Sequence, residues 1–417
     1  MLQVAEHCLE SNQRPQPPEG IFVRLLHSRA NLALTLLQRL AECSQLPRDI
    51  SPPLSKIAAA IYSVEDPFSK EQISYLRTLL KILFVVLKGS RYSANSEAPR
   101  APGDSSVAVT QQVLTILDRV VARSFRTLVT LVHEPDSATT PEDLALVTAV
   151  LQACLSVPGI EQCQVQILNI MVSFEVLQSA TSLFSWADKL ADRGDPIYGE
   201  LALLFLLELS TLPTIAEQLA IDGLLSHITT ANLTDFMRRD NVSPFADNTG
   251  AARCYGIWAK GVLPLLLNIL RSLGATIAPE VAYVLNQFPN LLRASAERFE
   301  APGISRTVSR EAQTVTLIAV AEINSLALLT RVLAVLRMNN QRDIPEVQWD
   351  TAAVLENVEF WLASRKVLRE RLLPLGPRES DWRAIKASDG SGCENLLEEK
   401  VVMQLEAVRD VLSEDLE

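Results

Sequence analysis

The sequence predicts an all-α protein built as an irregular α-solenoid of HEAT- and armadillo-like helical pairs. Three observations lead to this fold class. Among the 417 residues, 48% are hydrophobic, and 65 are leucine against 12 Phe, 6 Tyr and 5 Trp. Leucine favours helices, whereas aromatic and β-branched residues lead in strands. Apolar residues recur at helical spacing along most of the chain, and no segment shows the alternation of a strand.

The segment 69–89 shows the helical pattern most fully. Its apolar residues recur at steps of three and four, which places them on one face of a helix: Ile73, Leu76, Leu80, Leu83 and Leu87. Ser69 with Gln72 predicts a capping box at the start, and Gly89 predicts the end. Similar starts, with a side-chain oxygen followed by proline, occur at Ser51, Thr140 and Asp195.

The same reasoning predicts helices in order along the whole chain. Their expected ranges are 20–45, 52–64, 69–89, 105–134, 141–156, 159–191, 196–210, 213–229, 249–274, 279–300, 307–340, 344–373 and 393–414. Breaks are expected at 238–248, 301–306 and 375–392. Residues 91–106, which are rich in Pro, Gly and Ser and poor in apolar residues, predict a flexible loop.

The solenoid is predicted from helices that are apolar around most of their circumference. Between Tyr198 and Leu209 only two residues are charged, so this helix must be covered on more than one side. A helix stacked between its sequence neighbours meets that condition. Two similar stretches around Gly223 and Gly261 lie 38 residues apart, near the roughly 40–47 residues of armadillo and HEAT units. A compact multi-helix bundle remains the alternative.

One solenoid is expected over residues 1–417. The first residues read as a helix without a preceding cap, so we expect the chain to be the C-terminal domain of a longer protein.

Composition argues against several functions. The net charge of −11 disfavours a general nucleic-acid binder. The uninterrupted apolar stretches are short, so no membrane span is expected. The six cysteines have no paired spacing, and no two of the four histidines lie three or four residues apart on a helix. We therefore expect no metal, no cofactor and no catalytic site. An all-helical enzyme or exchange factor is the disfavoured alternative.

A candidate binding site lies in the predicted helix 344–373. Phe360 is placed beside a core stripe that includes Trp361, and the last turns carry a cluster of cations. Cations there complement the helix dipole or attract an acidic partner. The candidate protein-binding residues are Phe360, Arg365, Lys366 and Arg369. The last helix either closes the array with its acidic face outward or docks into a partner.

The block from Trp258 to Gly303 has a distinctive order of elements. Together with the helix from Thr307 and the Glu346–Trp349 segment that follow it, this block resembles the C-terminal region of the large inner-ring scaffold nucleoporins. The resemblance implies a superhelical, transport-receptor-like α-solenoid at the nuclear pore complex in the nuclear envelope.

The resemblance also implies the partners and the role of the chain. It would hold other nucleoporins through their helical linker segments, bind phenylalanine-glycine repeats weakly, and serve nucleocytoplasmic transport as a non-catalytic scaffold. The alternative is a soluble karyopherin-like transport receptor or an armadillo/HEAT adaptor. Release of a partner by a GTPase would favour that alternative.

Overall fold

The protein is all-α, as predicted, and its helices pack mainly against helices near them in sequence, as in an α-solenoid. The computed structural model describes residues 1–13, 19–45, 49–94, 104–190, 194–301, 314–339, 343–388 and 390–413, without the side chains of 19–23, 90–94 and 104–106. Within these residues the β-structure is limited to two isolated bridges, Val315 with Leu372 and Lys386 with Asn395.

The fold divides into two compact units. The first contains Met1–Leu183 and Leu204–Ile215, and the second contains Phe184–Leu203 and Ala216–Glu417. A single solenoid over 1–417 therefore stays a prediction. Each unit is described by itself below.

Helices of the first unit follow the predicted order. They are α1 (Leu2–Ser11), α2 (Glu19–Glu42), α3 (Ser51–Tyr62), α4 (Ile73–Ala94), α5 (Asp104–Ile116), the π-helical η1 (Leu117–Ala122), α6 (Arg123–Leu131), α7 (Pro141–Leu155), the 3-10 turn η2 (Ile160–Cys163), α8 (Gln164–Ser173) and α9 (Val176–Ser185). The division between the units falls within α9, α10 (Ile197–Leu209) and α11 (Pro213–Ile221).

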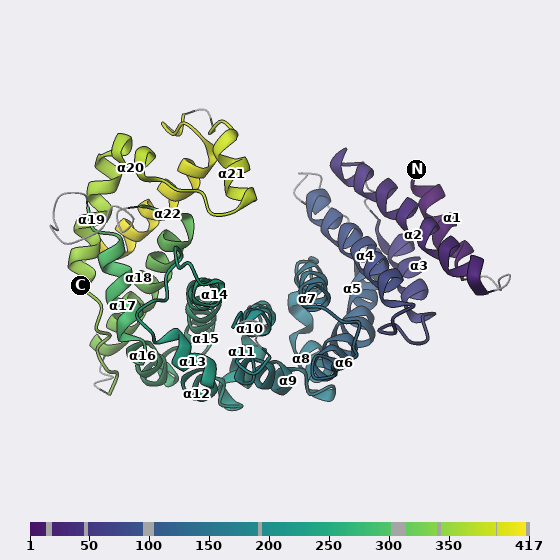
Figure 1. Cartoon of the computed structure of the whole chain (residues 1–417), viewed down its shortest axis with the longest axis horizontal. Coiled ribbons are helices and arrows are strands. Elements are labelled where there is room, and N and C mark those ends of the chain that lie inside the picture. Colours follow the sequence, from purple (N-terminus) through teal and green to yellow (C-terminus); the bar gives the residue numbers. More distant parts are fainter. Residues whose placement is uncertain are drawn as a thin grey trace. The chain divides into compact units, whose positions relative to one another are not determined.

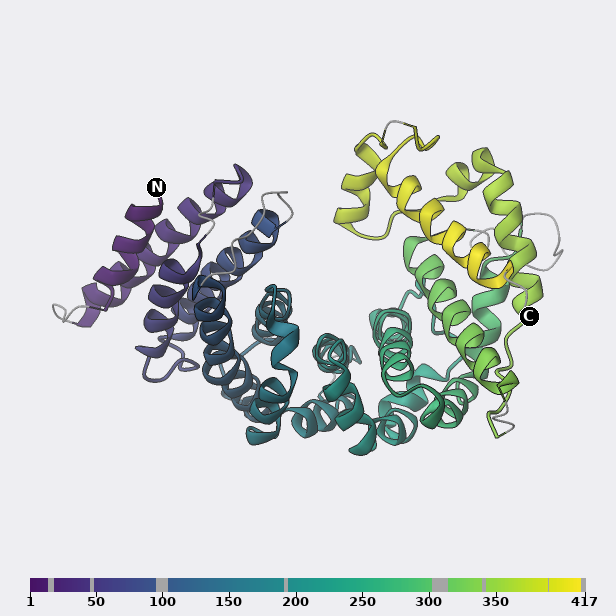
Figure 2. The ribbon, with the colours of Figure 1, turned by 180° about the vertical axis from the view of Figure 1, so that it is seen from behind.

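Packing in the first unit runs from each helix to its neighbours. Helix α2 packs against α1 and α4, and α4 packs against α3 and α7; Figures 1 and 2 show α1 to α4 side by side in purple to blue. The predicted apolar stripe of α4 is confirmed, since each of its members is at most 4% exposed: Ile73, Leu76, Leu80, Leu83 and Leu87.

Some predicted helix ends are wrong. The Ser69 hydroxyl donates back to the Asp66 carbonyl oxygen, so a turn precedes α4, which begins at Ile73 instead of at a capping box. Gly89 lies inside α4. Asp49 takes the place expected for Ser51, because its carboxylate accepts from the Ser51 backbone N–H. Both margins of the expected loop 91–106 are helical, and residues 95–103 lie outside the described residues.

The capping box of α7 is confirmed and is joined to α4. Asp143 accepts from the Thr140 backbone N–H at 2.7 Å. Arg77 of α4 donates to both oxygens of the same carboxylate, at 2.6 and 2.8 Å. One aspartate therefore accepts from the N-cap amide of α7 and also ties this helix to α4.

Helices of the second unit complete the chain. They are α12 (Leu224–Thr230), α13 (Asn232–Met237), α14 (Thr249–Gly256), the π-helical η3 (Ile257–Val262), α15 (Leu263–Leu273), the 3-10 turn η4 (Gly274–Thr276), α16 (Ala278–Asn286), α17 (Pro289–Arg298), α18 (Leu317–Met338), α19 (Thr351–Ala363), α20 (Arg365–Arg371), α21 (Pro377–Ala384) and α22 (Leu396–Ser413).

The core of the second unit surrounds α18. This helix packs against α15, η3 and α22, and Figure 2 shows α18 and α22 side by side in green and yellow. Trp258 of η3 is fully buried with its ring centroid 4.9 Å from that of Phe288. The all-round burial expected for α10 is confirmed: Ala202 and Leu203 are buried in the second unit, and Phe205 is stacked on Phe125 in the first.

Several predicted long helices are split. Gly223, with φ of +77°, separates α11 from α12, and Pro289 begins α17 after α16. Glu175, with φ of +53°, separates α8 from α9. The segment 343–350 is not helical, and α19 begins after it, where Asp350 acts as the N-cap by accepting from the Ala353 backbone N–H.

Other predictions within the second unit are also corrected. Gly261 lies inside η3 in right-handed helix, so it is not equivalent to Gly223 and the 38-residue repeat is wrong. Helix α13 lies between the expected helix 213–229 and the expected break 238–248, and α21 lies within the expected break 375–392. Asp195 does not act as the predicted cap with its side chain, which instead pairs with Arg253 at 2.7 Å. Of the expected helix 307–340, residues 307–313 and 340 lie outside the described residues.

Candidate functional site

The chemistry-bearing side chains are dispersed over the described residues. No group of three or more His, Cys, Asp or Glu side chains is placed to hold a metal ion within those residues. The Cys154 and Cys254 thiols are buried, and burial raises the pKa of both, that of Cys254 to about 11. Both thiols are therefore protonated and weakly nucleophilic near neutral pH.

The densest polar cluster is built around Glu322, in the middle of α18. Its carboxylate accepts from the Tyr255 hydroxyl at 2.6 Å, the Trp258 indole N–H at 2.9 Å and the Arg298 guanidinium at 3.0 Å. The glutamate is fully buried. Burial, and then the nearby carboxylate, raise the pKa of Tyr255 well above its usual value. With three donors satisfied, this cluster joins α14, η3, α17 and α18 and has a structural role.

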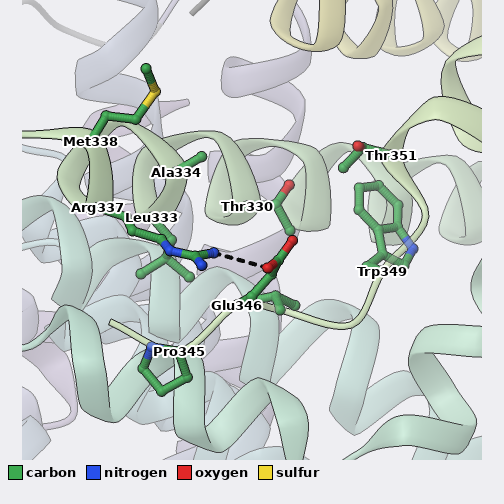
Figure 3. Close-up of a pocket in the computed structure, with 10 residues that line it drawn as sticks. Thr330, Leu333, Ala334, Arg337, Met338, Pro345, Glu346, Trp349 and Thr351 are labelled. Atoms are coloured by element: carbon green, nitrogen blue, oxygen red, sulfur yellow. Dashed lines mark ion pairs between the residues drawn. The ribbon is translucent and has the colours of Figure 1, made fainter. Parts of the chain in front are cut away.

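A groove follows the C-terminal half of α18 (Figure 3). Its volume is about 610 Å³, and its second wall is the extended segment that precedes α19. Arg337 and Glu346 face each other across it at 3.1 Å, with both side chains largely exposed. The lining residues are Thr330, Leu333, Ala334, Arg337, Met338, Pro345, Glu346, Val347, Trp349 and Thr351.

The second wall of this groove is held by contacts to two other helices. Asn286 of α16 donates to the Glu346 carbonyl oxygen at 2.9 Å and accepts from the Gln348 backbone N–H at 3.1 Å, so it pairs with the extended segment as a strand would. The Trp349 indole N–H donates to the Ser295 hydroxyl of α17 at 3.0 Å. The groove is thus a fixed surface of apolar and polar groups, suited to binding a peptide.

Residues Phe360, Arg365, Lys366 and Arg369 fall on two helices, since Ser364 separates α19 from α20. Phe360 is half-buried, with its ring edge-on to Trp361 at 5.5 Å between centroids. The core position predicted for Trp361 is confirmed: it is fully buried and donates to the Phe299 carbonyl oxygen at 2.9 Å.

Two of the three candidate cations contact α22. Arg365 lies 3.3 Å from Glu406, and Arg369 lies 2.8 Å from Glu398, whose side chain is fully buried. Lys366 is exposed. A binding role for these residues stays a prediction, to which the structure adds a role for Arg365 and Arg369 in holding α22.

Sequence reasoning missed the groove along α18 because its walls come from segments that tertiary contacts bring together. Pro345 and Asp350 were the available signals: a proline and a capping residue bracket the extended wall.

Two helical stretches of the described residues are long and apolar enough to cross a membrane by length and composition. Each contains an apolar stretch of 18 residues. In Thr249–Thr276, 67% of that stretch is buried inside the protein, and in Leu317–Met338 50% of it is buried. A third would be counted if Pro141–Leu155 and Ile160–Ser173, which are bent by 105°, formed one span. The absence of a membrane span therefore stays a prediction.

Helices stacked on their sequence neighbours, with surface grooves between them, define the class of protein as a helical solenoid whose ordered surfaces are available to partners. Residues 54–412 match the family described as the nuclear pore protein NUP188 C-terminal domain. The chain belongs to this family, and the match confirms the resemblance to the C-terminal region of the large inner-ring scaffold nucleoporins.

Individual relatives agree with the family. Nucleoporin NUP188 of Chaetomium thermophilum is 59% identical over 100% of this chain and 24% of its own length, so the chain spans about a quarter of that relative. Nucleoporin nup184 of Schizosaccharomyces pombe is 32% identical over 32% of this chain and 8% of its own length. The solved structure of Nup188(aa1445-1827) from Myceliophthora thermophila is 68% identical, with a TM-score of 0.79 over 88% of this chain and 99% of that one.

Proposed function

We propose that the chain is a structural scaffold component of the nuclear pore complex in the nuclear envelope, without catalytic activity. The observation that carries this proposal is the match of residues 54–412 to the NUP188 C-terminal family, in a fold made of stacked helices. Function in such a protein resides in the set of partners that its surface holds.

The partners are other nucleoporins, bound through short helical linker segments. An amphipathic helix binds an apolar groove through anchors at i, i+3, i+4 and i+7. The groove along α18 supports this proposal, because its second wall is held by hydrogen bonds and its lining includes the apolar side chains of Leu333, Val347 and Trp349.

The proposal also treats the two long apolar helical stretches, Thr249–Thr276 and Leu317–Met338, as parts of the protein core and not as membrane spans. At least half of the apolar stretch in each is buried inside the protein. Leu317–Met338 also carries Glu322, which is paired within the protein core. A charged side chain in a membrane is costly, whereas this one has three donors from neighbouring helices.

A pore-targeting experiment tests the scaffold function. The full-length protein, tagged at one end, is expressed in a fungal cell beside a nuclear-envelope marker and then purified with its partners. We expect a punctate nuclear rim and co-purification of nucleoporins. A diffuse distribution without nucleoporin partners contradicts the proposal, and release of those partners by a GTP-bound GTPase would instead indicate the transport-receptor alternative.

Weak binding of phenylalanine-glycine repeats is the finer part of the proposal. An apolar ring inserted between paired helices is little screened by salt, in contrast to a charge pair. Immobilised phenylalanine-glycine peptide should therefore retain the chain weakly at both low and high salt, with a serine-glycine peptide as the control. Retention that modest salt abolishes counts against it.

A further inference from the structure

A second groove, of about 810 Å³, lies within the first unit. Its sides are the connection between α3 and α4 and the helix formed by η1 and α6, with Phe174 from the end of α8. We propose that this groove binds a helical segment of another polypeptide chain that is acidic along one edge and basic along the other. The inference deepens the proposed scaffold function, on which it rests, by assigning the chemistry of one partner.

One wall of the groove is net basic, since it carries two arginines and one acid, Asp118 of η1. Arg119 and Arg123 lie four residues apart on the η1–α6 helix, and both are exposed. The Arg119 guanidinium stacks over the Tyr62 ring at 5.3 Å, which holds it at the groove. Neither arginine has an ion pair among the described residues, whereas Arg126 on the same helix is paired with Glu175 at 3.3 Å.

The opposite wall is acidic. Glu65 and Asp66 lie in the connection between α3 and α4 and are exposed, again without an ion pair among the described residues. The turn that carries them is ordered, since the Asp66 carbonyl oxygen accepts from both the backbone N–H and the hydroxyl of Ser69, at 3.2 and 3.0 Å. Opposite charges thus line the two sides of one groove without neutralising each other.

The floor between the walls is apolar. Ile61 and Leu76 are buried at 8% and 3% exposure, and Phe68, Leu131 and Phe174 are half-buried around them. Covering such side chains removes apolar surface from water, which stabilises a complex against the cost of association.

Charge complementarity selects the occupant. A purely acidic segment would be repelled by Glu65 and Asp66, and a purely basic one by Arg119 and Arg123. A strand presents side chains to only two faces, so it cannot address the floor and both walls together. A helix can, because an apolar stripe on its surface has a separate flank on each side. Acids at i and i+4 on one flank match the spacing of Arg119 and Arg123.

The test uses a phage-displayed library of 18-residue helical peptides, selected on the full chain, followed by fluorescence anisotropy with the enriched peptides. We expect enriched peptides with an apolar stripe, an acidic edge and a basic edge. The double substitutions R119E/R123E and E65K/D66K should each weaken binding roughly tenfold, since each reverses two interfacial charges.

Controls separate this groove from other surfaces. R39E changes an arginine that is 71% exposed on α2, outside the groove, and should leave the Kd within about twofold. The fourfold variant that reverses both walls should prefer a peptide with its acidic and basic edges exchanged. Because the substituted side chains are exposed, circular dichroism should confirm that each variant is folded.

Two results would overturn the inference. In one, the enriched peptides keep their affinity for both double variants; in the other, no peptide of the expected pattern is enriched. If the tagged protein is still found at nuclear pores, either result refutes the binding of such a helical segment at this groove and leaves the scaffold function standing. Loss of pore targeting with intact peptide binding would instead refute the scaffold function and leave the peptide specificity of this groove standing.

Discussion

Removing the Glu322 carboxylate should strongly destabilise the second unit. The substitution Glu322→Ala leaves three buried donors without an acceptor: the Tyr255 hydroxyl, the Trp258 indole and the Arg298 guanidinium. Each of the three bonds ends on an ionised carboxylate, which makes it charge-assisted and worth about 1.5–3 kcal/mol. Because the three bonds share one acceptor and their contributions are not additive, removal of one partner from a buried ion pair gives the better scale, a loss of about 3–5 kcal/mol.

Urea unfolding followed by tryptophan fluorescence measures this loss, because Trp258 lies in the cluster. The control is Glu297→Ala on the neighbouring helix, where the side chain is 58% exposed and 3.7 Å from Arg293; it should change the free energy of unfolding by less than about 0.5 kcal/mol. The pair Arg298→Met with Glu322→Leu should recover at least half of the loss, since apolar replacements remove both buried charges together. A loss below about 1 kcal/mol for Glu322→Ala, with an unchanged m-value, would refute the reasoning.

Three further results are expected. Burial raises the pKa of Cys254 from 9.0 to about 11, so the unfolded chain releases this proton first as pH rises. Through this group the protein should lose about 2 kcal/mol of stability between pH 8 and 10.5, and a Cys254→Ala variant that loses stability equally steeply in urea unfolding would contradict this. Gly250→Ala should destabilise by about 1–3 kcal/mol, because the new Cβ would lie 2.1 Å from the Gly194 carbonyl oxygen, whereas Gly256→Ala on the same helix meets its nearest neighbour at 3.4 Å; equal Tm values for the two variants would argue against the close approach. Arg369→Ala should lower the Tm more than Lys366→Ala, since Arg369 is paired with a buried carboxylate, and the reverse order would remove the structural role assigned to Arg369.

Local patterns predicted the elements well where burial follows spacing along a single helix. The stripe of α4 and the core position of Trp361 needed only the helical period. The Thr140–Asp143 cap needed only neighbouring residues. At Ser69 the same reasoning failed, because the hydroxyl bonds to Asp66 behind it instead of to the turn ahead.

The sites could not be predicted in the same way, because their partners are distant in sequence. Glu322 interacts with residues 24, 64 and 67 positions away, and from the sequence alone it reads as an isolated charge in an apolar helix. The cations Arg365 and Arg369 read as a surface for an acidic partner, but α22 supplies acids 41 and 29 residues later. The groove along α18 depends on Asn286 holding a segment 60 residues further on.

The π-helical turns η1 and η3 each hold one residue more than an ordinary helix would need. A π turn contains about one residue more than an α turn for a similar rotation, so deletion of a single residue there would restore the ordinary helix and leave the face of the following helix almost unchanged. In α6, Phe125 would then stay against Phe205, whose ring centroid lies 3.8 Å from its own. The same deletion within an α-helical stretch would turn the following residues by about 100°. Proteins that share this architecture should consequently accept a one-residue deletion at these turns more readily than elsewhere in the same helices, and sequence gaps within those helices should fall there.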